Sequence, residues 1–146
     1  MTPEQTPPIP LHDEPGHLIR RAHQAAVAAF HDTHGRQITP VQYAVLRALA
    51  AEPGIDQVTL AQRVALDTST TADIATRLEA KGWIVRALRA RRQRELSLTP
   101  EGQAVLDAML PGVNPMYQRL LGGFSPAEQA TLVALLRRFV GADTPG

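Results

Sequence analysis

Two groups of polar side chains near the middle of the chain have the chemistry to bind nucleic acid. The first combines hydroxyls, one carboxylate and one guanidinium at the start and along one face of an expected helix: Thr68, Ser69, Thr70, Asp73 and Arg77. The expected face also carries Thr76. The second consists of four arginines within the sequence LRARRQR: Arg89, Arg91, Arg92 and Arg94. Hydroxyls and carboxylates bond to base edges in a major groove, while arginines bind phosphates and guanine edges. Together the two groups indicate a helix that reads DNA, followed by a basic loop.

Local signals bound the helix that carries the first group. Residues 67–69 can accept hydrogen bonds from the free amides of a first turn, so we expect the helix to begin there. Gly82 ends it, as glycine does where φ must become positive. Its inward face repeats at helical spacing through Thr71, Ile74, Ala75 and Leu78. A shorter helix comes before it, for which we expect a small strand at Gln57 and Val58 and a cap at Thr59.

After Gly82 the apolar pattern changes to a period of two. The alternation runs through residues 83–87 and again through residues 95–98, which predicts two strands joined by the arginine-rich loop. Trp83, the single tryptophan, is expected to pack at the base of this hairpin. A helix-turn-helix followed by a basic hairpin can place its second helix in a major groove and its loop on phosphates or in a minor groove.

Charge is unevenly distributed along the chain. The formal net charge is only +1, but seven basic residues and one acid lie between Arg77 and Arg94. Nearly all of the basic residues are arginines, which favours binding to nucleic acid. The alternative is that Arg91 and Arg92 form a solvated charge run without a partner.

The run TLAQRVALDTSTTADIATRLEAKGWIVR, followed by RR and LSLTPEG, resembles the winged helix-turn-helix of the MarR (multiple antibiotic resistance regulator) family. The resemblance covers nearly the whole chain. The sequences IDQVTLA and PGHLIRRAHQ are similar to the branch of that family that senses aromatic acids and phenols. One departure is Ala90, which stands where the family's wing usually carries Asp.

Helices are expected on both sides of the winged segment. The pairs Thr39-Pro40, Thr99-Pro100 and Ser125-Pro126 each combine a cap with a proline suited to a first helical turn. Pro111 and Pro115 are expected to bend or break the helix that follows Thr99. Apolar stripes on these outer helices exceed what a small winged helix can cover, which predicts a two-fold homodimer.

The expected fold is mostly α with a small β-wing, arranged as a winged helix-turn-helix lobe and a helical dimerisation lobe. We expect a flexible arm at 1–15 and a MarR-like domain at 16–146. Within that domain the predicted dimerisation helices are 16–38 and 101–141, and the winged helix-turn-helix is 39–100. A two-fold dimer would place its recognition helices about 34 Å apart, one turn of a pseudo-palindromic duplex.

The resemblance also implies an effector cavity between the two lobes. The candidate ligand-binding residues are His17, Arg20, Arg21, Tyr43 and Arg47. An arginine could pair with a ligand carboxylate, and tyrosine or histidine could bond to a phenolic oxygen. The alternative is that the arginines form salt bridges between subunits and that Tyr43 belongs to the core.

The sequence also bears on a metal site, an enzyme active site and a winged helix without a regulatory role. All five histidines precede residue 35, and His31 with His34 could share a metal beside Asp32 or Asp13, but no second cluster of ligands follows. We therefore expect neither metal nor cofactor. Ser69, His23 and Asp73 do not form a recognisable nucleophile motif, so no enzyme is expected. A winged helix that only shapes DNA or binds protein remains a third class.

No cysteine is present and no apolar run reaches the length of a membrane span, so we expect a cytoplasmic protein. The hypothesis is a homodimeric repressor that a small aromatic carboxylate or phenol releases from double-stranded DNA. The alternatives are a metal-sensing regulator that uses the N-terminal histidines and a DNA-binding protein without an effector.

Overall fold

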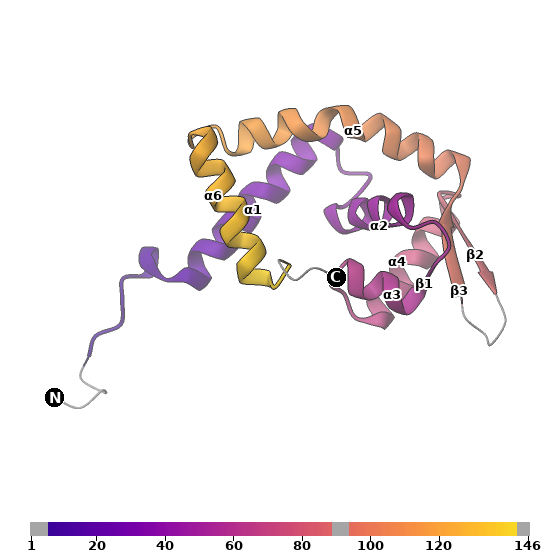
Figure 1. Cartoon of the computed structure of the whole chain (residues 1–146), viewed down its shortest axis with the longest axis horizontal. Helices are drawn as coiled ribbons and strands as arrows, with labels where there is room; N and C mark the ends of the chain where they lie inside the picture. The colour runs from indigo at the N-terminus through magenta and orange to yellow at the C-terminus, as the bar shows by residue number, and fades with distance from the viewer. Residues whose placement is uncertain (1–5, 89–93, 143–146) are drawn as a thin grey trace. The chain divides into compact units, whose positions relative to one another are not determined.

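The computed structural model describes residues 6–88 and 94–142 of the 146-residue chain (Figure 1). Its elements confirm a mostly helical fold with a small sheet. They are the 3-10 helix η2 (Leu11–Asp13), α1 (Pro15–His34), α2 (Pro40–Ala51), β1 (Ile55–Asp56), α3 (Gln57–Arg63), α4 (Thr68–Ala80), β2 (Ile84–Leu88), β3 (Arg94–Leu98), α5 (Pro100–Leu120) and α6 (Pro126–Val140).

The chain divides into two compact units. The winged-helix unit is Phe30–Val113, and the helical unit combines Met1–Ala29 with Asn114–Gly146. Within the stretches that the structure describes, no helix is both long enough and apolar enough to cross a bilayer.

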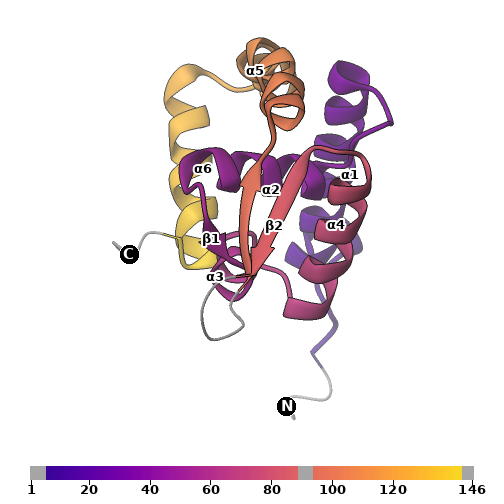
Figure 2. The same ribbon diagram turned by 90° about the vertical axis from the view of Figure 1, so that its right-hand side faces the viewer.

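The sheet of the winged-helix unit is antiparallel, with the strand order β1-β3-β2. Figure 2 shows β2 and β3 side by side, with α4 next to β2. Ile84 pairs with Leu98, and Leu96 pairs with both Ile55 and Arg86. Ile84 and Leu96 are buried while Val85 is 49% exposed, so one face of the sheet packs on the helices. The largest fully buried apolar side chains of the core are Val45, Leu46, Leu49, Leu60, Leu78, Ile84, Leu96 and Leu106.

Capping chemistry sets where the two helices of the helix-turn-helix begin. The start of α4 lies within the predicted residues 67–69: Asp67 is the cap and accepts a hydrogen bond from the Thr70 amide at 2.7 Å. The prediction for α3 was wrong by one turn, because the strand is Ile55–Asp56 and the cap is Asp56, not Thr59. Asp56 accepts from the Thr59 amide at 3.0 Å and also from its hydroxyl. An ionised carboxylate accepts both bonds of one threonine, which leaves Thr59 inside the helix.

The same hydrogen-bonded motif ends both helices. After α4 the amide of Trp83 donates to the carbonyl of Leu78 at 3.0 Å, and Gly82 has φ +79°. After α3 the amide of Leu66 donates to the carbonyl of Ala61 at 3.0 Å, but the left-handed residue is Ala65, with φ +57°. A Cβ is disfavoured in this backbone region, so the turn of the helix-turn-helix carries strain that the end of α4 does not.

Trp83 and Lys81 connect the end of α4 to the loop before α2. The Lys81 ammonium lies 4.5 Å from the centre of the half-buried Trp83 ring. Its Nζ also donates to the carbonyl of Gln37 at 2.9 Å. A cation over an indole face is attracted by the ring's negative face, so one lysine joins both segments.

Helix α5 begins against the backbone of Trp83, the residue just before β2. The Thr99 amide donates to the carbonyl of Trp83 at 3.0 Å, and the Thr99 hydroxyl accepts from the Gly102 amide at 3.0 Å. A Cβ on Gly102 would lie 1.9 Å from the carbonyl oxygen of Trp83, so only glycine allows this approach. The predicted cap at Thr99 is therefore confirmed.

Pro111 and Pro115 were expected to bend or break this helix, and the break is wrong, because α5 is continuous from Pro100 to Leu120. An interior proline costs about 3 kcal/mol. Met109 and Met116, which flank the prolines, are both buried, and burying each such side chain contributes about 1.5–3 kcal/mol. A continuous apolar face therefore offsets the lost backbone bonds.

The buried face of α2 is set by helical spacing and by its cap. Val45 and Leu49 are buried, but Val41 is 38% exposed. Leu46 and Gln42 are buried in addition. Gln42 turns inward because its side chain accepts from the Thr39 amide, which completes the capping box at the start of α2.

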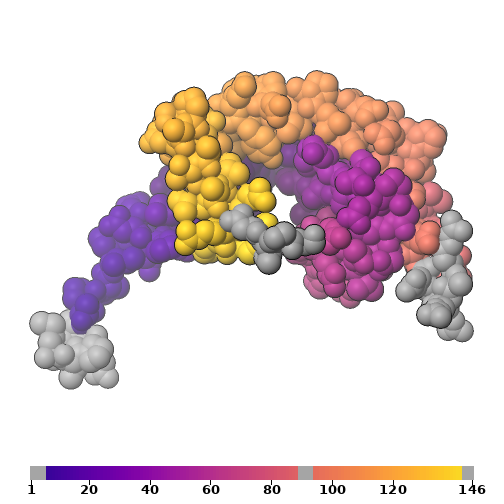
Figure 3. Space-filling model, viewed as in Figure 1, coloured from indigo at the N-terminus to yellow at the C-terminus, as the bar shows by residue number. Residues whose placement is uncertain are grey.

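In the helical unit, α6 leaves an apolar surface uncovered by the described chain. Ser125, the predicted cap, and Glu128 cap this helix reciprocally. Figure 3 shows its surface in yellow, beside the end of α5. Its large apolar side chains that are about half exposed or more are Leu135, Leu136, Phe139 and Val140. An open groove of about 900 Å³ runs along the same helices, lined by residues that include Ala26, Tyr117, Leu132 and Val133.

The two left-handed caps predict opposite effects of exchanging alanine and glycine. Ala65→Gly should raise the free energy of unfolding by up to about 1 kcal/mol, because it relieves the left-handed strain. Gly82→Ala should lower it by about 1 kcal/mol through strain alone, since a Cβ there meets nothing within 4 Å. Urea unfolding monitored by circular dichroism measures both. Destabilisation by Ala65→Gly would contradict the assignment of strain to this turn.

Candidate nucleic-acid interface

One face of α4 presents four of the five residues predicted to read bases, and the fifth, Thr68, is the first residue of the helix. Thr68, Ser69, Thr70, Asp73 and Arg77 are exposed. The opposite face is buried through Thr71, Ala75 and Leu78, with Ile74 half-buried. Because the inner face fixes the rotation of the helix, the direction in which the outer residues point is fixed as well.

The Asp67 carboxylate organises the exposed end of α4. Its Oδ1 accepts from the Thr70 amide at 2.7 Å and from the Ser69 hydroxyl at 3.0 Å, while Oδ2 accepts from the Thr70 hydroxyl at 2.9 Å. These bonds, the one from the Thr70 amide above all, hold the pKa of the Asp67 carboxyl below its ordinary value of 3.8. The carboxylate is therefore ionised at neutral pH and stands at the positive end of the helix.

Arg86 of β2 holds the other end of α4. Its Nη2 donates to Glu79 Oε1 at 3.0 Å and to the Thr76 hydroxyl at 3.2 Å. The Arg86 side chain is 14% exposed, against 41% for that of Glu79. The hydrogen bond from Arg86 lowers the pKa of the Glu79 carboxyl from its ordinary value of 4.5. The strand and the recognition helix are thus joined by a partly desolvated ion pair.

Only one of the four wing arginines belongs to the described residues. Arg94 is exposed at the start of β3 and lines a hollow of about 220 Å³ with Glu79, Arg86, Ala87 and Leu88. Its charge adds to the lowering of the Glu79 pKa. Arg89, Arg91 and Arg92 lie outside the described residues.

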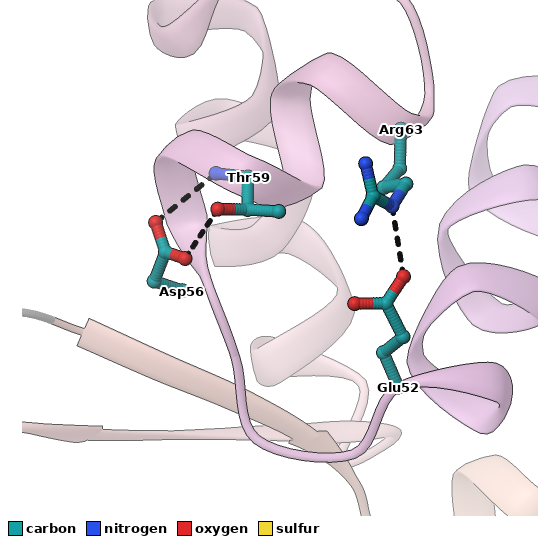
Figure 4. A network of polar contacts seen from close by, with 4 residues as sticks. All are labelled: Glu52, Asp56, Thr59 and Arg63. Carbon is teal, nitrogen blue, oxygen red and sulfur yellow. Dashed lines mark hydrogen bonds and ion pairs between the residues drawn. The ribbon is translucent and has the colours of Figure 1, made fainter. Parts of the chain in front are cut away.

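Helix α3 is fixed to α2 by a second network (Figure 4). Arg63 Nε donates to Glu52 Oε1 at 2.8 Å, which raises the pKa of the Arg63 guanidinium. At the other end of α3, the bonds from the Thr59 hydroxyl and amide lower the pKa of the Asp56 carboxyl. Helix α3 is therefore capped by Asp56 at its start and bonded to Glu52 through Arg63 at its end.

Known proteins share this arrangement. A model of the MarR family matches residues 38–94, which begin just before α2 and end at the first residue of β3. The transcriptional regulator HosA of Escherichia coli O157:H7 is 36% identical over 105 residues, which are 70% of this chain and 78% of HosA. The chain belongs to the MarR family. It is therefore a DNA-binding transcriptional regulator and not an enzyme.

Solved MarR-family structures superpose over nearly the whole chain. The PcaV transcriptional regulator from Streptomyces coelicolor, in complex with its natural ligand, has a TM-score of 0.87 at 37% identity and covers 94% of this chain and 99% of PcaV. Bordetella bronchiseptica BpsR, solved to explain regulation of its DNA binding by 6-hydroxynicotinic acid, has a TM-score of 0.84 at 32% identity. That match covers 92% of this chain and 99% of BpsR.

The predicted effector residues of this MarR-family chain lie in two groups. In the helical unit, Arg20 Nη2 donates to His17 Nδ1 at 3.1 Å, and Arg21 is exposed on the same helix. In the winged-helix unit, Arg47 Nη1 donates to the Tyr43 hydroxyl at 3.1 Å, and its guanidinium lies 5.9 Å from the centre of the Tyr43 ring. Two polar pairs are thus formed, and their sharing of one effector cavity stays a prediction.

The histidines considered for a metal are engaged in other contacts. His31 Nδ1 donates to the carbonyl of Gly35 at 2.9 Å. His34 packs 4.8 Å from the Phe30 ring and stacks on Tyr43 at 6.1 Å, and this burial lowers its pKa. Across residues 6–88 and 94–142, no three His, Asp or Glu side chains group closely enough to hold a metal ion.

Arg86, Asp56 and the Glu52–Arg63 pair were not predicted from the sequence. Arg86 alternates with apolar residues on a strand. This alternation predicts which face of the sheet its side chain lies on, but it does not predict that its partner is Glu79, seven residues earlier on a helix. Asp56 could have been found, because Asp56 and Thr59 have the same spacing as Asp67 and Thr70. That repeated pattern was the available signal.

Removing the ion pair at the end of α4 should reduce acid sensitivity as well as stability. Because the folded pKa of Glu79 lies below 4.5, its contribution is fully present above that pH and is lost as pH falls through the folded value. Glu79→Gln should cost about 1 kcal/mol at pH 7 and nothing further in acid, so its stability profile below pH 4.5 should be flatter.

Thermal unfolding between pH 7 and pH 3 measures this difference. Arg63→Ala, which breaks a more exposed pair of the same kind, is the matched control and should cause a smaller loss at pH 7. Identical acid profiles for Glu79→Gln and the unsubstituted protein would contradict the role given to this pair.

Proposed function

We propose that this MarR-family regulator is a homodimeric repressor that binds a pseudo-palindromic duplex and is released by a small aromatic carboxylate or phenol. The observation that carries the DNA-binding mode is the exposed polar face of α4, oriented by the buried Thr71, Ala75 and Leu78. Inserted in a major groove, Asp73 can accept from a cytosine amino group, and Arg77 can bond to guanine or phosphate.

A second copy of the chain is the proposed cover for the apolar surface of α6. Phe139 is 71% exposed and Val140 69% exposed, an unusual state for large apolar side chains in sequence neighbours. Pairing around a two-fold axis would bury both copies of this surface and set two recognition helices about 34 Å apart. The proposed segments for this contact are 16–38 and 101–141, and the proposed compartment is the cytoplasm.

Release by an effector needs a difference in affinity between two states of the dimer. A hundredfold loss of DNA affinity corresponds to about 2.7 kcal/mol of differential binding. A charge-assisted bond from Arg20, Arg21 or Arg47 to a carboxylate can supply much of this. BpsR supports the proposed class of effector, since 6-hydroxynicotinic acid is an aromatic acid that carries a hydroxyl group.

Removing a wing arginine should weaken binding to all sequences alike. Arg94→Ala deletes two guanidiniums from a dimer, so the slope of log affinity against log salt should become shallower by about two units. Filter-binding titrations at several salt concentrations measure this slope. Arg138→Ala on α6 removes the same charge from the helical unit and should leave the slope unchanged. Equal slopes for both variants would contradict the proposed phosphate contact.

An aromatic acid should stabilise the protein and dissociate it from DNA. A thermal-shift screen of benzoates, hydroxybenzoates, cinnamates and divalent metals, repeated with operator DNA, tests this. At least one of Arg20→Ala, Arg21→Ala and Arg47→Ala should weaken the response about tenfold, because a charge-assisted bond is lost. Arg63→Ala, whose arginine pairs with Glu52, should respond normally. Silence from every aromatic, beside a zinc response abolished in His31→Ala, would overturn the effector proposal.

A further inference from the structure

The hydroxyl protons of Ser69 and Thr70, at the start of α4, already form hydrogen bonds within the protein. Ser69 and Thr70 both donate their hydroxyl proton to Asp67, at 3.0 and 2.9 Å. An ionised carboxylate has no proton to give, so the direction of both bonds is fixed. Each hydroxyl has a single proton, and what remains for an outside partner is its lone pairs.

Asp73 and Thr76, further along this exposed face, likewise offer a base only hydrogen-bond acceptors. Asp73 carries a carboxylate, which only accepts. The Thr76 hydroxyl donates to the carbonyl of Ala72 at 3.0 Å and accepts from Arg86 at 3.2 Å, so it has no proton left for a base. The next donor along this face is the guanidinium of Arg77. The hydroxyl of Thr68, the first residue of α4, takes no part in the bonds that Ser69 and Thr70 make to Asp67.

We propose that Asp67 sets the hydrogen-bonding polarity of the recognition helix, so that Ser69 and Thr70 read bases only as acceptors. This inference rests on the proposed entry of α4 into a major groove. Cytosine N4 and adenine N6 are the amino donors on that edge, whereas guanine and thymine present only acceptors there. At the two positions these residues contact, the contacted strand must therefore carry A or C. A keto oxygen at either position would face a lone pair and leave both groups unpaired.

Asp67→Asn reverses one of these bonds without removing the cap. Asparagine caps helices about as well as aspartate, and its oxygen can keep the bond from the Thr70 amide. Its NH2 group then replaces Oδ2 and donates to the Thr70 hydroxyl, which frees the threonine proton. Ser69 still faces the retained oxygen, at the position where Oδ1 stands. The substitution thus changes the polarity of Thr70 and leaves that of Ser69.

Selection from a random duplex library compares the unsubstituted protein with Asp67→Asn. The unsubstituted protein should select half-sites with two positions restricted to A or C. In Asp67→Asn one of these should change to G or T, while the other stays. Asp56→Asn is the matched control, because Asp56 makes the same two bonds to Thr59 on α3 and its replacement should leave the selected sequence unchanged.

A direct measurement uses the unsubstituted protein alone. Replacing the selected adenine by purine deoxyriboside, or the selected cytosine by a pyrimidinone deoxyriboside, removes only the amino group and should weaken binding about tenfold at each position. Selection of no duplex at all would overturn the proposed function. Selection of a half-site that is indifferent to these amino groups, or one identical for Asp67→Asn, would overturn the inference and leave DNA binding standing.

Discussion

The contact between Arg86 and Glu79 is the constraint on which the proposed DNA-binding surface depends. A recognition helix is useful only if its rotation and its position beside the wing are both fixed. Burial of Thr71, Ala75 and Leu78 fixes the rotation, while Arg86 ties the last turns of α4 to β2 through Glu79 and Thr76. With the guanidinium mostly removed from water, the pair holds two elements that carry different parts of the proposed interface.

The two helices of the helix-turn-helix are built with one repeated device. Asp56 and Asp67 each stand three residues before a threonine and bond to both its amide and its hydroxyl. Both helices then end in the same pair of backbone bonds. The differences lie in what is added: α3 is tied to α2 through Arg63, whereas α4 keeps its outer face exposed. The same capping and ending motifs thus build one helix that supports the unit and one whose exposed face is proposed to read DNA.

What the sequence predicted well was decided by nearby residues. The starts of α2, α4 and α6 follow from a cap and its third neighbour, so Thr39 and Ser125 were identified correctly and the start of α4 was placed within residues 67–69. The start of α3 was missed because Asp56 and Thr59 can both cap, and only the strand pairing of Ile55 with Leu96 decides between them.

Features that depend on contacts between distant residues could not be predicted from local sequence patterns. The continuity of α5 depends on the burial of Met109 and Met116, which local proline rules do not contain. The exposed face of α4 was predicted from helical spacing, but the commitment of its hydroxyl protons to Asp67 needs atomic positions. The Arg86–Glu79 pair joins β2 to α4. The pattern within one strand does not predict which helix residue its arginine will bind.

The single tryptophan occupies a position that makes the protein its own spectroscopic probe. Trp83 follows the last residues of α4, and its carbonyl receives the Thr99 amide at the start of α5. The Lys81 ammonium above its ring also holds the carbonyl of Gln37. Any displacement of these segments changes the charge next to the indole, so its fluorescence emission reports directly on the base of the wing without a label.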